Sequence, residues 1–178
     1  MEDRPETIEE LHLDHFVTEE GDLIPPTDRN AVDHIWPTQS IPYVISPEIS
    51  SRTPDIQRAT MMISSKTCLT FHQRTSEIDY LHFQDSLGCA SYVGCIGGDQ
   101  PVFIGSVCGA EKNFVKRPGN TLNVSYDTDS IMHYGSQYFS SNGEPTIISN
   151  HRSKNMGQRV KLTSKDIKRI RLLYGCDS

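Results

Sequence analysis

The chain has 178 residues, of which 35% are hydrophobic and 22% charged, and its formal net charge is −6. This length predicts one domain or two small lobes. The acidic balance argues against a nucleic-acid partner, which would favour a basic face. Because no run of 18 apolar residues occurs, the sequence predicts neither a transmembrane helix nor a membrane partner.

Cysteine usage indicates an oxidising compartment. The five cysteines form no Cys-x-x-Cys pair, which favours disulfides over a cysteine-built zinc site and predicts a secreted protein. They are Cys68, Cys89, Cys95, Cys108 and Cys176. Residues 1–6 are acidic and polar, so no signal peptide is predicted there. Two alternatives reconcile these indications: the natural start lies upstream, or the product is mislocalised.

Residues 1–29 are predicted to form a separate N-terminal arm. They are acidic and have no sustained apolar period. Pro25 and Pro26 disfavour both a helix and a central strand at the end of this arm.

A helix and several short strands are predicted in the next part of the chain. Residues 41–46 alternate as a strand does, and Pro42 indicates an edge strand. At Thr53, a hydroxyl followed by a proline and an acid predicts the cap of a helix that runs to Lys66. Further strands are predicted at residues 69–74, 79–85, 90–95 and 101–107. The predicted class is α+β, with one helix on a sheet whose apolar face needs a second covering layer.

The C-terminal part is predicted to be irregular and to close with a helix. Glycine and proline recur throughout residues 109–160. Thr163 followed by Asp166 has the spacing of a helix cap, and Gly175 fits the end of the helix.

The hexapeptide Ser-Ile-Met-His-Tyr-Gly at residues 130–135 is the most informative stretch for function. It resembles the Met-turn of the astacins, which are metzincin zinc metalloendopeptidases. Other stretches resemble the family in the same order, namely Trp36-Pro37, Ile41-Pro42-Tyr43, Lys66 to Phe71, Gly88 to Gly94, Met156 to Arg159 and Leu173 to Cys176. The resemblance extends over residues 19–176 and is closest to hatching enzymes, which soften egg envelopes.

This resemblance implies a fold, a cofactor and a substrate class. The fold would have an N-terminal lobe with one helix on a twisted sheet and an irregular C-terminal lobe with a closing helix. Zinc would be the cofactor, and proteins or peptides would be the substrates. Met132 would lie beneath the zinc, and Tyr134 would be a switchable ligand that stabilises the oxyanion. No oligomeric state is implied.

The resemblance also implies two disulfides, Cys68 with Cys176 and Cys89 with Cys108. The longer loop would stabilise the fold by roughly 4–5 kcal/mol and the shorter by roughly 3 kcal/mol. Cys95 is left over, either as a free thiol or in an intermolecular bridge.

The N-terminal arm resembles an astacin propeptide. Asp22, in a Gly-Asp pair, would ligate the zinc and keep the zymogen inactive. Cleavage after Arg29 would release the arm and leave Asn30 as the new N-terminus, so residues 30–178 would be the catalytic domain. Separately, Asn123 begins an Asn-Val-Ser glycosylation triplet.

The zinc-binding motif of the family is missing from the sequence. Astacins carry HExxHxxGxxH, in which three histidines bind zinc and the glutamate is the general base. The seven histidines of this chain include no pair at spacing i, i+4, and none is followed by glutamate. Family-like sequence through residue 109 passes directly into residues 110–114, of which residues 112–114 resemble sequence that the family places well beyond the motif. The sequence therefore predicts that a segment containing both the motif and the active-site helix has been excised.

Three interpretations of the excision follow. The chain is an astacin that no longer hydrolyses peptides, a non-catalytic binding or decoy protein, or the nonfunctional product of a skipped exon or a faulty gene model. A lost helix that buried six apolar side chains would remove about 9–18 kcal/mol of stabilisation. A domain is stable by only about 5–15 kcal/mol, so we expect a partly folded or aggregation-prone product.

Overall fold

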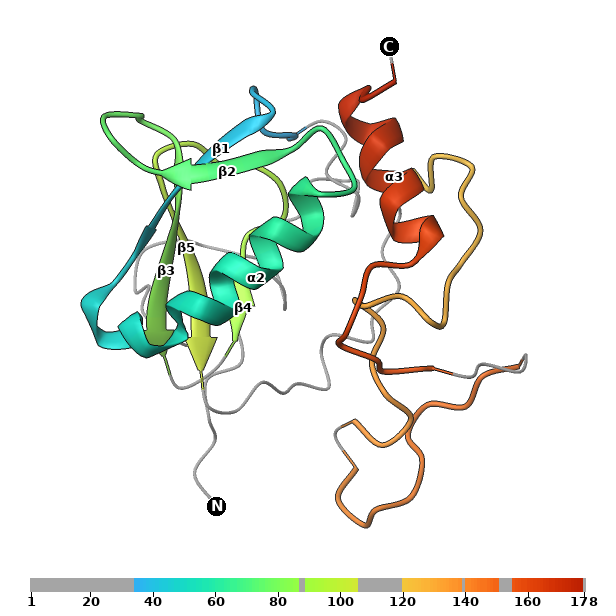
Figure 1. Cartoon of the computed structure of the whole chain (residues 1–178). Coiled ribbons are helices and arrows are strands. Elements are labelled where there is room, and N and C mark those ends of the chain that lie inside the picture. Colours follow the sequence, from blue (N-terminus) through green and yellow to red (C-terminus); the bar gives the residue numbers. More distant parts are fainter. Residues whose placement is uncertain (1–33, 87–88, 106–119, 139, 151–154, 178) are drawn as a thin grey trace.

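The computed structural model describes residues 34–86, 89–105, 120–138, 140–150 and 155–177. One helix lies across a sheet in the N-terminal lobe, beside an irregular segment that ends in a second helix (Figure 1). This is the predicted α+β class. Within the described residues, no helix is long and apolar enough to cross a membrane.

The sheet has five strands in the order β2-β1-β3-β5-β4. They are β1 (Ser40–Ile45), β2 (Thr70–Gln73), β3 (Tyr80–Ser86), β4 (Ala90–Ser91) and β5 (Asp99–Gly105). All neighbours are parallel except β4, which is antiparallel to β5. The predicted strand at residues 90–95 is wrong after Ser91, because the chain turns and Gly94 has a φ of 79°.

The prediction that Pro42 marks an edge strand is wrong. Strand β1 lies inside the sheet and pairs with both β2 and β3. The carbonyl of Tyr43 accepts a hydrogen bond from the β2 side, so the neighbouring Pro42 faces the β3 side. Pairing with β3 begins only at Tyr43, and the missing N–H of Pro42 therefore costs no hydrogen bond in that ladder.

Helix α2 (Thr53–Ser64) lies on one face of the sheet (Figure 1) and ends two residues earlier than predicted. Thr53 is its first residue and not its cap. A short 3-10 helix, η1 (Pro47–Arg52), runs directly into α2, and the capping position falls on Arg52, which makes no side-chain capping bond. The sequence prediction missed η1, and the cap was misplaced for that reason.

The two faces of the sheet differ in chemistry. Register places Tyr43 opposite Leu81, and Phe83 opposite Val102, so these apolar side chains share the face on which α2 lies. The core begins there with buried Trp36, Ile41 and Leu69. Partly buried residues from α2, the sheet and the closing helix pack against this cluster, namely Ile63, Phe71, Leu81, Cys95, Ile170 and Tyr174.

The closing helix α3 (Ser164–Tyr174) has the predicted cap and end. Thr163 and Asp166 form a reciprocal capping box, and Gly175 adopts the left-handed conformation at φ 60°.

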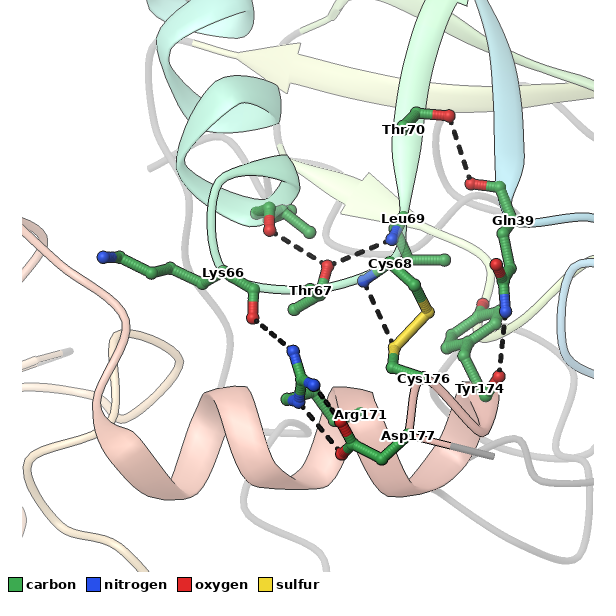
Figure 2. Close-up of a disulfide and its surroundings, with 11 residues drawn as sticks. Gln39, Lys66, Thr67, Cys68, Leu69, Thr70, Arg171, Tyr174, Cys176 and Asp177 are labelled. Carbon is green, nitrogen blue, oxygen red and sulfur yellow. Dashed lines mark hydrogen bonds and ion pairs between the residues drawn. A yellow bond between two sulfur atoms is a disulfide. The ribbon is translucent and has the colours of Figure 1, made fainter.

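A disulfide between Cys68 and Cys176 fastens the end of α3 to the chain that enters β2 (Figure 2). This is the pair that the family resemblance implies. Arg171 donates to the Lys66 carbonyl at 3.3 Å, and Gln39 Nε2 donates to the Tyr174 carbonyl at 3.2 Å, so hydrogen bonds reinforce the same junction (Figure 2).

Candidate metal centre

The Met-turn is held by the first turn of α3 through one buried carboxylate. Asp166 is 8% exposed and accepts a hydrogen bond from Ser130 Oγ at 2.6 Å. It also accepts the backbone N–H groups of Ile131 at 3.3 Å and Thr163 at 2.9 Å. Asp166 therefore joins two segments that lie 36 residues apart, and the capping box of α3 is part of the Met-turn's support.

Electrostatics keep this carboxylate ionised. Burial would raise the pKa of Asp166, but the hydrogen bonds from Ser130, Thr163 and Ile131 outweigh burial and hold the pKa below its ordinary value. The ionised form accepts all three donors at once, which the protonated form does not.

Arg159 holds the other side of the turn. Its Nη1 donates to the carbonyls of Ile131 and His133, each at 2.8 Å, so it brackets Met132 from both sides. Gly157 approaches Gly135 so closely that a Cβ on Gly157 would lie 2.4 Å from the Gly135 Cα. The φ of Gly157 is 85°, so glycine is required there both sterically and conformationally.

Two side chains of the turn have predicted roles at zinc. Met132 is 82% exposed, so in this chain nothing lies over it within the described residues. The Tyr134 ring stacks on Tyr138 with 5.3 Å between ring centroids. His133 Nδ1 donates to the Tyr134 carbonyl at 2.6 Å, and its ring meets Tyr126 edge-on. The turn is thus built, but its methionine faces outward.

The described residues do not fit a zinc ion. Within that part of the chain, no three histidine, cysteine, aspartate or glutamate side chains gather in a group that could hold a metal. The described histidines that have side-chain hydrogen bonds form them with other protein groups. His72 contacts Glu77 at 2.9 Å, and this bond from His72, ahead of backbone bonds from Thr75 and nearby residues, lowers the Glu77 pKa to about 2.

A hydrogen-bonded Ser-His-Asp arrangement on the polar face of the sheet was missed by the sequence reasoning. His82 Nε2 lies 3.0 Å from Ser46 Oγ, and its Nδ1 lies 3.1 Å from the Asp99 carboxylate. The Ser46 backbone N–H donates to the Phe83 carbonyl, so it is not available to stabilise an oxyanion. The arrangement connects the residue that follows β1, the third residue of β3 and the first residue of β5, and we interpret it as structural.

Several predicted site residues lie outside the described part of the chain. These are Asp22, Arg29, Asn30 and Cys108. Cys89 is disulfide-bonded, and Cys95 is a free, partly buried thiol whose pKa is raised by burial. Asn123 is exposed on a turn with a φ of 56°.

Comparison with known proteins identifies the family of this chain. The peptidase-family model "Astacin" matches residues 28–116 and 109–175, which together span most of the chain, so the chain belongs to the astacin family. The sequence is 31% identical to High choriolytic enzyme 1 of Oryzias latipes over 209 residues, covering 88% of this chain and 77% of that protein. The solved structure of that hatching-enzyme zinc-protease matches with a TM-score of 0.68 at 26% identity, covering 82% of this chain and 96% of that one.

Other relatives are longer proteins. Blastula protease 10 of Paracentrotus lividus is 34% identical over 193 residues, and Zinc metalloproteinase nas-13 of Caenorhabditis elegans is 31% identical over 194 residues. The matches cover 80% and 83% of this chain. The chain spans 32% of the first relative and 43% of the second.

The alignment lengths indicate that many positions of these relatives have no residue in this chain. The match to High choriolytic enzyme 1 extends over 209 positions but uses 88% of 178 residues, or about 157, which leaves about 52 positions without a residue in this chain. The same arithmetic for Blastula protease 10, 193 positions against about 142 residues, leaves about 51. The family model gives two separate matches that overlap at residues 109–116, which is where the sequence predicts the excision.

Proposed function

We propose that this chain is an astacin-family protein that binds protein substrates without hydrolysing them. The block of about 50 missing positions carries this proposal. By the family resemblance this block includes HExxHxxGxxH, and with it the three zinc histidines and the general base. Without the metal and base, the chain has no means to activate water for attack on a peptide bond.

The sheet edge supports the binding half of the proposal. Strand β4 is the last strand of the sheet and pairs with β5 only at Ala90 and Ser91. An extended peptide would add to this edge through main-chain hydrogen bonds. An egg-envelope protein is the substrate we favour, because High choriolytic enzyme 1 is described as a hatching enzyme.

The remaining family features belong to the same proposal. The chain would be secreted, with residues 1–29 as a propeptide cleaved between Arg29 and Asn30. Cys89 would pair with Cys108, and Asn123 would be glycosylated. Asp22 and Tyr134 would have metal-ligand roles only in a form that contains the missing block.

The test compares the chain with a chimera. The chimera carries, between residues 108 and 112, the block that High choriolytic enzyme 1 has and this chain lacks. Both proteins are incubated with zinc and a fluorogenic casein, with and without a chelator. We expect chelator-sensitive hydrolysis from the chimera alone, and binding of casein by both proteins.

Chelator-sensitive hydrolysis by the unmodified chain would refute the proposal. If the chimera hydrolyses casein, the rest of the chain is able to support catalysis. The lack of hydrolysis by the unmodified chain is then due to the missing block. If the chain neither cleaves nor retains casein while the chimera does both, the binding half of the proposal fails.

A further inference from the structure

An apolar groove of about 640 Å³ lies between α2 and the sheet, with α3 at one end. Its floor is formed by Phe83, Val102 and Ile104, and its wall by Ala59 and Ile63 of α2. Trp36 also lines it and is the only tryptophan of the chain. Strands of parallel sheets are usually buried on both faces, yet Val102 and Ile104 are only partly buried here. Within the described part of the chain, the groove is thus a part of the sheet face that no other element covers.

The polar groups of the lining need no polar ligand. Gln100 is buried, but its amide donates to the Gly94 carbonyl at 2.8 Å and accepts the Ile96 N–H at 3.0 Å. Asp55 is the one charged residue among the described lining, and it already contacts Arg58 at 3.4 Å. The groove therefore favours an occupant with an apolar stripe and no charge directed inward.

Backbone chemistry restricts the occupant further. The floor presents side chains and not free strand edges, so an inserted segment must satisfy its own backbone N–H and C=O groups. An α-helix does this, and an extended segment does not. Strands β3 and β5 have seven residues each, or about 23 Å, which a helix of about 15 residues would span.

The alignments indicate where such a helix comes from. The block missing from this chain falls just after β5, which ends at Gly105, next to groove-lining Ile104. We propose that the groove accepts, in trans, an amphipathic helix from a separate polypeptide that carries this block, such as an astacin relative. The inference concerns helix docking alone and is independent of whether the chain hydrolyses peptides.

Trp36 fluorescence provides the test. Overlapping synthetic peptides that cover the block of High choriolytic enzyme 1 are titrated into the full chain in the presence of a chelator, so that metal plays no part. Because Trp36 is already buried, we expect a saturable change in the intensity of its emission at one peptide per chain, with scrambled peptides inactive. A peptide that becomes helical on binding, measured by circular dichroism, identifies the docking segment.

Two variants test whether the peptide binds in the groove. Ala59→Phe fills the groove, and Val102→Lys puts a charge on its floor; each should weaken binding at least about tenfold. Val160→Lys is the matched control, because Val160 is 80% exposed and lies away from the groove, and it should leave binding unchanged. Ala59→Phe keeps the test decisive if Val102→Lys fails to fold.

Three results would overturn the inference. One is no Trp36 response to any block peptide at about 100 μM, a concentration that detects even weak specific binding. Another is equal binding to wild type and Ala59→Phe. The third is a dimer, seen by sedimentation, that Ala59→Phe dissociates, since the groove would then be filled by a second copy of this chain.

Discussion

Asp166 is the residue on which the arrangement of the Met-turn depends most. Replacing it with asparagine removes the negative charge and turns one acceptor into a donor, which then faces Ser130 or Thr163. We expect Asp166→Asn to lower the free energy of unfolding by about 2–3 kcal/mol. Urea denaturation measures this, and Asp85→Asn, at an exposed carboxylate, should stay within about 0.5 kcal/mol of wild type. Equal losses in both variants would contradict the assigned role.

The same carboxylate predicts the direction of a pH effect. Because the folded-state pKa of Asp166 lies below its ordinary value, its stabilisation is complete above the unfolded pKa of about 3.9 and is lost as pH falls through the folded pKa. Wild type should therefore lose more stability than Asp166→Asn between about pH 5 and pH 2.

The packing of the Gly157 segment on the Met-turn makes a prediction at the scale of elements. Gly157→Ala adds both backbone strain and a clash with Gly135, and should cost about 3 kcal/mol. Gly143→Ala is its control, because Gly143 has a similar φ of 82° but open space around its Cβ position, so only strain of about 1 kcal/mol is expected. Similar denaturation midpoints for the two variants would show that the Gly135 contact is unimportant.

The junction of α3 with β2 depends on the Cys68–Cys176 disulfide. The two cysteines are 108 residues apart in sequence, so Cys176→Ser should lower the free energy of unfolding by about 4–5 kcal/mol in oxidising buffer. Added reductant should remove the difference from wild type. Cys95→Ala, at the free thiol, is the control; a loss in Cys95→Ala as large as in Cys176→Ser would mean that the loop is not the source of stability.

Helices and strands with a regular sequence pattern were predictable, whereas the elements that lie next to them were not. Alternation identified β1 and β3, and the spacing of Thr163, Asp166 and Gly175 identified α3 with its cap and end. The prediction of an edge strand from Pro42 failed because strand register decides whether the sheet needs a hydrogen bond from residue 42. Register is a tertiary property that the local sequence does not reveal. The prediction that Thr53 caps α2 failed because η1 supplies the turn that precedes the helix.

At the scale of the whole molecule, the missing motif was predictable because a fixed spacing of histidines is visible in sequence. The groove was not predictable, because it forms where α2, the sheet and α3 meet. The link from Asp166 to Ser130 joins residues that no local pattern connects. The sequence predicted an apolar sheet face that needs a second covering layer, and the structure shows which residues of that face line the groove.

That surface predicts the behaviour of the isolated chain. The open groove and the exposed Met132 should bind an apolar dye such as ANS, and block peptides should suppress the part of the signal that arises from the groove. A single cooperative thermal transition with no dye binding would contradict the expectation of an incompletely packed chain.

The proposed function requires that this astacin-family chain binds no catalytic zinc. Zinc content decides it most directly, measured by plasma mass spectrometry after the purified chain is saturated with zinc and dialysed, with the block-restored chimera alongside. We expect about one zinc per chimera and a negligible fraction in the unmodified chain. One retained zinc per unmodified chain would refute the proposed function and would require a ligand set outside the described residues.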